Sequence, residues 1–215
     1  MPPPIPTPIY RIIQVDNLAV YLQRNALHAP QHTPNNGLTY RTIHDLEIQR
    51  KRRQERIPCG PGGTIHDYLS FYFGYLSPML FRLHTGQVEG YEGNQETIIY
   101  LVTTCQEIER RGMEFVFSDG HGIAVFTSWF EDLDNLDQVD WQMVYQRYWR
   151  DTNKDLDQQR RKQAEFLVHQ SCPWDAIQEI GVCTVEMRRR VSAILDTFPN
   201  RHKPVVKVRK NWYYY

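Results

Sequence analysis

Short apolar runs of strand-like composition, spaced irregularly along the chain, constrain this fold most. Their content of Val, Ile, Tyr and Phe predicts strands at residues 9–15, 67–73, 97–103, 114–118, 124–129, 166–168 and 204–215. Between them, helices are predicted at residues 16–25, 43–56, 106–111, 141–149, 173–181 and 186–198. Because these elements follow no regular β-α-β-α order, the sequence predicts an α+β fold around a mixed or antiparallel sheet.

Capping residues set the expected helix boundaries. Asp16 and Thr184 are of the N-cap type and stand at the start of two predicted helices. Pro173 and Gly181 are placed as a proline near a helix start and a glycine past a helix end, so they bracket a short helix. The segment 43–56 has a helix-forming composition but few apolar residues, and we expect it on the surface, held by a partner or by substrate.

Length and composition limit the class of protein. At 215 residues we expect a single domain over residues 1–215. No signal peptide and no run of 18 apolar residues is present, so a cytoplasmic protein without a membrane segment is expected. The 4 cysteines form no Cys-x-x-Cys pair and the 8 histidines do not cluster, so neither a disulfide framework nor a metal site is predicted.

Charge is balanced in total but clustered along the chain. Lys+Arg and Asp+Glu number 25 each, so net charge indicates no partner. Basic residues nevertheless gather at 50–53, 160–162, 188–190 and 203–210. Such clusters suit a phosphate-binding face, and solvated helix faces are the alternative. The aromatic share of 13% is high, and Tyr and Trp can form ligand walls and stacking surfaces as well as a core.

One carboxylate lies where a functional acid could be. Glu165 stands at the junction between the polar run 151–162 and the apolar run 166–168. In a strand it would share a face with Leu167, opposite Phe166 and Val168. A carboxylate that enters a buried strand is either a paired structural charge or a functional acid, and the residues alone leave both readings open.

Common catalytic motifs are absent. The chain contains no Gly-x-Gly-x-x-Gly, Walker, His-Glu-x-x-His or Gly-x-Ser-x-Gly sequence. His66 and Asp67 are neighbours in a predicted strand and would face opposite sides, so they make a poor dyad. The remaining features, one Glu, an aromatic strand, a basic segment and several Trp residues, suit binding of a flat, charged ligand more than a hydrolase.

Several segments together resemble the DarT family of DNA ADP-ribosyltransferase toxins in order and spacing. They are residues 9–18, 60–68, 71–73, 77–79, 100–102, 117–120, 140–141 and 163–168. The resemblance covers nearly the whole chain and implies an ADP-ribosyltransferase-like split mixed or antiparallel sheet with flanking helices around a nicotinamide cleft. It also implies that NAD is the co-substrate and that no metal takes part.

The same resemblance implies a function. Family members attach ADP-ribose to a base of single-stranded DNA, which blocks DNA replication, and a macrodomain antitoxin reverses the modification. For this chain thymine is the expected base, with guanine as the less favoured one, and a monomer is the expected state. Two other functions stay open: a non-catalytic nucleic-acid-binding module on the same fold, and a transferase that acts on RNA or protein.

Two catalytic residues follow from the resemblance. Glu165 resembles the family's catalytic glutamate, and a fixed carboxylate can stabilise the positive charge that develops as the nicotinamide–ribose bond breaks. Arg56 is the predicted basic residue beside the reacting base, with Arg52 and Arg53 as rivals. Since base chemistry needs an unstacked base, a single-stranded substrate avoids much of the cost of extrusion.

The resemblance also implies binding residues. The predicted NAD contacts are Tyr10, Gln14, Asn17, Tyr72, Phe73, Ser77 and Met79. At position 14 the family more often has His, and Gln can still hydrogen-bond a ribose hydroxyl. The predicted DNA contacts are Arg50, Arg52, Arg53, His121, Trp129 and Trp149. Core packing is the alternative for the aromatic members of both sets.

Overall fold

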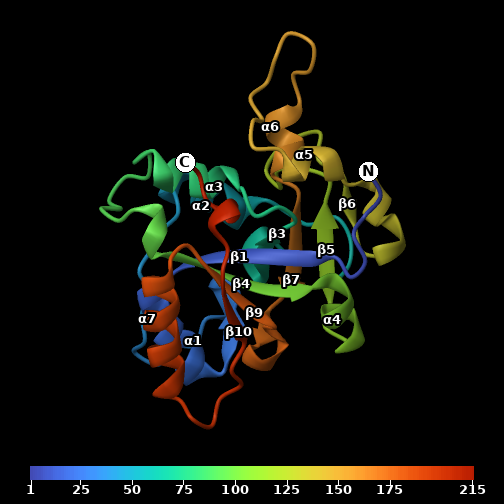
Figure 1. Cartoon of the computed structure of the whole chain (residues 1–215). Coiled ribbons are helices and arrows are strands. Elements are labelled where there is room, and N and C mark those ends of the chain that lie inside the picture. The colour runs from blue at the N-terminus through green and yellow to red at the C-terminus, as the bar shows by residue number, and fades with distance from the viewer.

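The computed structural model describes residues 1–215 and is built on one large sheet (Figure 1). In sheet order its eight strands are β10 (Val205–Val208), β9 (Glu179–Val182), β4 (Ile98–Thr104), β1 (Pro8–Gln14), β3 (Tyr68–Tyr72), β7 (Glu165–His169), β5 (Phe115–Ser118) and β6 (Trp129–Phe130). All neighbours are antiparallel except the parallel pair of β10 and β9. A small second sheet pairs β2 (Ala26–His28) with β8 (Ser171–Pro173). The predicted α+β class with a mixed sheet is confirmed.

Seven helices flank the sheet. They are α1 (Leu18–Arg24), α2 (Leu46–Gln54), α3 (Pro78–His84), α4 (Cys105–Arg110), α5 (Trp141–Tyr145), α6 (Gln158–Lys162) and α7 (Val185–Asp196). In Figure 1, α1 and α7 lie side by side at one end of the sheet, and the segment between α5 and α6 projects from the opposite end. None of these helices combines the length and the apolar character needed to cross a bilayer.

The sheet is split between β1 and β3. β1 pairs with β4 over seven residues, from Pro8 opposite Thr104 to Gln14 opposite Ile98. β3 pairs with β7 over five residues. β1 and β3 share a single register pair, Tyr10 opposite Tyr72. The two halves of the sheet therefore meet at one position, and the side chains beyond it are free to line a cavity.

The two faces of β1 are buried in different cores. Ile9 and Ile13 belong to the main apolar cluster, whereas Tyr10 and Ile12 belong to a second cluster that contains Trp212. This division follows the two-residue period of a strand. Arg11 is on the same face as Ile9 and Ile13, so one charged side chain interrupts the main-core face of the strand.

The predicted helix at 173–181 is wrong. The chain there forms β8, a 3₁₀ turn at Trp174–Ala176 and then β9 between β4 and β10. Gly181 does not end a helix. A Cβ on it would lie 2.4 Å from Cζ3 of Trp212, so this strand position needs a glycine to let the indole pack against it.

Four other predicted boundaries are also corrected. Asp16 is not an N-cap: the Gln14 side chain accepts its backbone N–H, and α1 begins only at Leu18. The expected strand at 124–129 is reduced to β6, the helix at 141–149 to α5, and the strand at 204–215 to β10. After β10 the aromatic tail continues as a 3₁₀ turn and buries Tyr213 and Tyr214 in the second cluster. Thr184 does cap α7, since its side chain accepts the Met187 N–H.

Candidate active site

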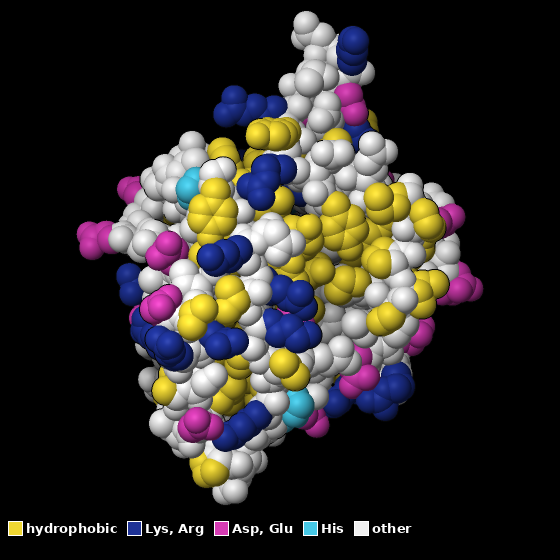
Figure 2. All heavy atoms as spheres, in the orientation of Figure 1, with side chains coloured by type: hydrophobic (Ala, Val, Ile, Leu, Met, Phe, Trp, Pro, Cys, Tyr) yellow, Lys and Arg dark blue, Asp and Glu magenta, His cyan; other side chains and the backbone are white.

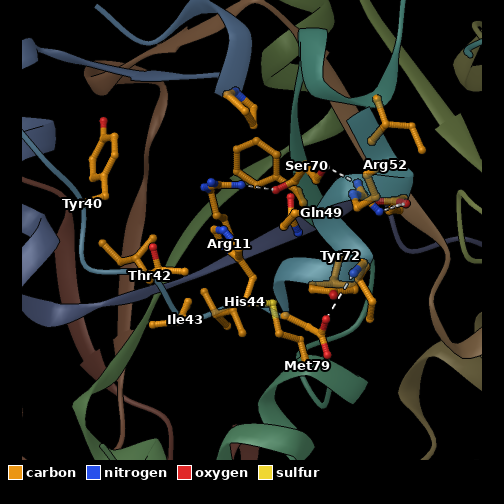
Figure 3. Close-up of a pocket in the computed structure, with 18 of the residues that line it drawn as sticks. Arg11, Tyr40, Thr42, Ile43, His44, Gln49, Arg52, Ser70, Tyr72 and Met79 are labelled. Atoms are coloured by element: carbon orange, nitrogen blue, oxygen red, sulfur yellow. Dashed lines mark hydrogen bonds and ion pairs between the residues drawn. The ribbon is translucent and has the colours of Figure 1, made fainter. Parts of the chain in front are cut away.

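A pocket opens at the split in the sheet and encloses about 300 Å³ (Figure 3). Its floor comes from β1, β3 and the first residue of β7, and one wall comes from the segment 40–52, which includes the first two turns of α2. Figure 3 shows Arg11 near the centre, with Ser70 and Arg52 on one side and Tyr40 and Thr42 on the other. The size and the mixture of aromatic and polar walls are typical of a small-molecule site.

Glu165 is the carboxylate of this pocket. It begins β7 directly opposite Tyr72, and only 3% of the residue is exposed. As the strand period predicts, Phe166 and Val168 turn to the main core, while Leu167 packs in a separate small cluster on the side of Glu165. The Gly122 backbone N–H donates to Glu165 Oε1 at 3.2 Å. The acid is therefore buried at the cavity floor and not at the protein's edge.

Arg52, on α2, holds both oxygens of Glu165. Its Nη1 donates to Oε1 at 2.9 Å and its Nη2 to Oε2 at 2.8 Å. Nη2 also donates to the Ser70 hydroxyl at 2.8 Å. Such a bidentate pair fixes the plane of the carboxylate as well as its charge. Asp45 starts the helix by accepting the N–H groups of Glu47 and Ile48.

Arg56, the residue predicted at the reacting base, does not line the pocket. It is exposed, and it forms an isolated antiparallel bridge with Thr64. Four residues apart, Arg52 and Arg56 would share a face if the helix continued. However, α2 ends at Gln54, so the side chain of Arg56 is not carried along that face. The structure brings its rival Arg52 to Glu165 instead.

The pocket is electropositive, since four arginines and two carboxylates line it. Burial raises the pKa of Glu165, but the Arg52 guanidinium outweighs burial, so its pKa lies below the usual value. Burial, and then Arg11, His66 and Arg52, lower the pKa of His44 to about 4, which keeps its ring neutral at pH 7. Burial and the nearby Glu165 raise the pKa of Tyr72 to about 12.

The loop after β5 packs closely against the Glu165 carboxylate. A Cβ on Gly122 would lie 2.6 Å from Glu165 Oε1 and 3.2 Å from the Trp129 ring. Because Arg52 already holds the carboxylate, the added methyl group of Gly122→Ala should displace Glu165. We expect kcat to fall by about 10- to 100-fold, since small displacements of reacting groups reduce rates by this factor. Steady-state kinetics with NAD and DNA, the substrates that the sequence resemblance implies, measure this. Ser128→Ala, an exposed change in the same loop, is the control. Unchanged kcat in Gly122→Ala would contradict the tight fit.

The predicted NAD residues divide into two groups. Asn17, Tyr72 and Met79 line the pocket. The other four, Tyr10, Gln14, Phe73 and Ser77, do not line the pocket, and each makes contacts elsewhere. Tyr10 packs edge-on against Tyr75 and Trp212 in the second core.

Local contacts account for the other three. Gln14 caps the turn before α1, and Ser77 caps α3 by accepting the Leu80 N–H. Phe73 is fully buried in the main core. Its ring packs edge-on against Phe117 and Trp141.

The predicted DNA residues are spread over three segments. Arg50 and Arg53 are exposed on α2. His121 lines the pocket, and Trp129 lies beside Gly122 at its edge. Trp149 does not line the pocket. Its Nε1 donates to the Tyr214 hydroxyl at 3.2 Å, and its ring packs on Phe81.

Arg11, Ser70 and His44 are pocket residues that the sequence did not single out. Arg11 could have been found, because a cation between Ile9 and Ile13 in an apolar run is as unusual as Glu165 before Phe166. Ser70 and His44 carry no comparable signal. Among His, Cys, Asp and Glu side chains, no group of three or more is arranged to hold a metal ion.

Known proteins match this chain over nearly its whole length. The family model described as "ssDNA thymidine ADP-ribosyltransferase, DarT" matches residues 10–214. A DNA ADP-ribosyl transferase of Thermus sp. (strain 2.9) is 40% identical over 211 residues, which is 98% of each chain.

Two solved structures are similar throughout. Thermus sp. 2.9 DarT in complex with ADP-ribosylated ssDNA superposes with a TM-score of 0.93 at 39% identity, covering 100% of this chain and 99% of that one. The same Thermus protein in complex with NAD⁺ superposes with a TM-score of 0.89 at 38% identity, covering 99% and 100%. The resemblance seen in the sequence is confirmed: this chain belongs to the DarT family of DNA ADP-ribosyltransferases.

Proposed function

We propose that this chain transfers ADP-ribose from NAD to a thymine base of single-stranded DNA, acting as a single-domain monomer. The observation that carries the proposal is the Glu165–Arg52 pair, a buried carboxylate and guanidinium on the floor of a pocket of nucleotide-binding size. The family description names thymidine in single-stranded DNA, and the similar Thermus protein is known with NAD⁺ and with ADP-ribosylated DNA, which supports the same substrates here.

In the proposed reaction the bond between ribose C1′ and nicotinamide nitrogen breaks, and nicotinamide leaves with the bonding electrons. A base nitrogen attacks C1′ and releases its proton to solvent, so one C–N bond replaces another. Glu165 stabilises the positive charge on the ribose in the transition state. It is ionised at neutral pH because Arg52 holds its pKa low. Tyr72, directly opposite in the sheet, keeps a neutral phenol and forms a wall for the nicotinamide.

Arg52 is better placed than Arg56 to act beside the base. Its guanidinium is already at the carboxylate, so a base that enters over Glu165 meets a cation able to stabilise charge on the base oxygens. Loss of the base proton leaves negative charge on those oxygens, and a guanidinium favours that charge. We therefore propose that Arg52, and not Arg56, has the base-proximal role. Arg50 and Arg53 keep their predicted role as phosphate-binding residues at the surface.

A single strand could reach this site across a basic and aromatic surface. Lys and Arg side chains gather over the centre of the face in Figure 2, next to a broad hydrophobic area. Val125 and Phe126, in the loop that carries Gly122, are 92% and 85% exposed. Phe126, together with His121, Trp129 and Trp149, offers aromatic stacking surfaces, each stack contributing about 1–3 kcal/mol. Binding should weaken as salt rises.

We also propose that the protein is the toxin of a toxin–antitoxin pair, which blocks DNA replication and is opposed by a macrodomain antitoxin. Membership of the DarT family supports this role. Induction of the chain should arrest growth and DNA synthesis in a bacterial host, and a macrodomain hydrolase that removes ADP-ribose from DNA should restore both. Arrest by Glu165→Gln as strong as by the wild type would count against it.

The central test uses NAD and oligonucleotides that differ in one base, read by mass spectrometry. A mass increase of one ADP-ribose on thymine-containing single strands, with release of nicotinamide, is the expected result. Salt-dependent DNA binding without nicotinamide release would favour the non-catalytic alternative. Guanine-only adducts, or adducts on competing RNA or protein, would assign a different acceptor.

A further inference from the structure

The basic cluster at residues 160–162 is occupied by contacts inside the protein. Lys162 is 2% exposed and donates its Nζ to two backbone carbonyl groups at the end of α5. Arg161 pairs with three carboxylates and Arg160 with two. None of these cations is free for a phosphate, so the cluster serves the position of other parts of the chain.

Arg160 is held by carboxylates from two segments. Its Nη1 donates to Asp119 Oδ1 at 2.7 Å, and its Nε and Nη2 donate to the two oxygens of Asp157 at 2.8 Å each. Asp119 directly follows β5, whereas Asp157 precedes α6 at the end of the projecting segment in Figure 1. Only 15% of the Arg160 side chain is exposed. One guanidinium therefore joins the projecting segment to the loop between β5 and β6.

The first residues of that loop are fixed by Arg160. Asp119 Oδ1 accepts the Ser128 N–H at 2.9 Å as well as the guanidinium, so one oxygen holds the base of the loop. A Cβ on Gly120 would lie 2.4 Å from Arg160 Nη1 and 2.8 Å from its Cγ, so the side chain lies directly on the loop backbone. The Arg160 carbonyl accepts the His121 N–H at 2.9 Å. Side chain and backbone of one residue thus anchor the start of the loop.

The loop 119–128 connects the pocket with the proposed DNA surface. His121 lines the pocket, and the Gly122 N–H donates to Glu165. Phe126 is 85% exposed. The Thr127 hydroxyl donates to the His121 carbonyl at 2.7 Å, so the loop is also bonded within itself and moves as a unit if its anchor is lost. A single strand that enters over Glu165 therefore meets a loop whose position depends on Arg160.

We propose that Arg160 is a positioning residue that holds the loop 119–128 in the conformation that receives the single strand. The inference rests on the proposed function, because it concerns the acceptor of the same reaction. A loop that is fixed in advance does not have to be ordered when DNA binds, and such ordering lowers affinity. Glu165 keeps its bidentate contact with Arg52 whatever the loop does, so binding of the nucleotide should not depend on Arg160.

The test separates DNA binding from nucleotide binding in Arg160→Met. Fluorescence anisotropy measures the affinity for a thymine-containing single-stranded oligonucleotide, and calorimetry measures the affinity for ADP-ribose. If His121 and Phe126 have to be ordered on binding, the oligonucleotide should bind roughly 5- to 150-fold more weakly. The KM for oligonucleotide should rise in proportion. The affinity for ADP-ribose and the kcat at saturating oligonucleotide should be unchanged.

Asp119→Asn distinguishes positioning from direct contact with phosphate. The amide keeps an oxygen for the Ser128 N–H but offers no charge to Arg160. We expect Asp119→Asn to weaken DNA binding as Arg160→Met does, and the double variant to lose little more, since both changes break the same pair. Stronger DNA binding by Asp119→Asn would overturn the proposal, because a freed guanidinium would then be a phosphate ligand. In that case Arg160→Met would also reduce the slope of log affinity against log salt concentration by about one.

Arg161→Met is the matched control. Arg161 is the next residue of α6, and its hydrogen bonds go to Asp140, Asp155 and Asp157 and not to the loop 119–128. Its DNA affinity should equal that of the wild type. Equal losses in the two arginine variants, loss of ADP-ribose affinity in Arg160→Met, or unchanged DNA affinity in Arg160→Met would each overturn the proposal. If the wild type makes no DNA adduct, the proposed function fails, while these equilibrium affinities still decide the role of Arg160.

Discussion

Glu165→Gln should abolish transfer of ADP-ribose to DNA, lowering kcat by about 10²–10³-fold or more, the usual cost of removing one preorganised group that stabilises transition-state charge. The amide keeps the size and the hydrogen-bonding capacity of the side chain but has no charge to offer the ribose. Because the carboxylate is buried and fixed by Arg52 and Gly122, water cannot replace it. Single-turnover measurements of nicotinamide release and of DNA adduct report the chemical step directly.

Glu114→Gln is the matched control. Glu114 also pairs with a basic side chain, His169 at 3.2 Å, but its carboxylate is largely exposed at the far end of β7. That variant should keep wild-type activity. A folded Glu165→Gln variant that retained more than about a tenth of the wild-type kcat would show that Glu165 is only a structural ion-pair partner of Arg52. Loss of a carboxylate that stabilises transition-state charge lowers kcat by far more than tenfold.

The strands were predictable because their signal is local. Runs such as 97–103 are apolar on both faces. A strand that is buried between two cores has to be apolar on both faces, so its sequence is easy to recognise. The segment 173–181 failed because Pro173 and Gly181 serve equally in a strand–turn–strand. In the structure the segment 179–182 pairs with β4 and β10, and the ring of Trp212, thirty-one positions away, occupies the space next to Gly181. Such distant packing leaves no mark near the segment itself.

The candidate site was predictable to the same extent. Glu165 shows itself locally as a charge at the mouth of an apolar strand, and Arg11 shows the same signal on β1. The choice between Arg52 and Arg56 does not depend on local composition. It depends on where α2 ends and on which side chain meets a partner 113 residues later in the chain. The sequence identifies the basic segment that lies near the candidate site, but it does not identify which arginine of that segment reaches Glu165.

Arg52→Met should destabilise the fold by about 3–5 kcal/mol at neutral pH, because it leaves the Glu165 carboxylate buried without a counter-ion. Urea unfolding measures the change. The double variant Arg52→Met/Glu165→Gln removes both charges and should recover much of that free energy, but no activity. The exposed neighbour Arg53→Met is the control, and its unfolding free energy should match that of the wild type.

The loss should also depend on pH in a way that only a coupled pair explains. In the wild type the folded-state pKa of Glu165 lies below the ordinary glutamate value of 4.5. The pair therefore stabilises the protein above that pH, and this stabilisation is lost as pH falls through the folded-state pKa. Without Arg52, burial outweighs the remaining lowering effects of His121 and the Gly122 N–H, and it raises the folded-state pKa of Glu165 above the unfolded one. Protonation of Glu165 at low pH therefore raises the free energy of unfolding of the variant relative to its value with the carboxylate ionised. In the wild type the same protonation lowers the free energy of unfolding. The difference in unfolding free energy should therefore be largest near pH 7 and shrink below pH 4.5, and a difference that stays constant across this range would show that Arg52 contributes packing and not charge.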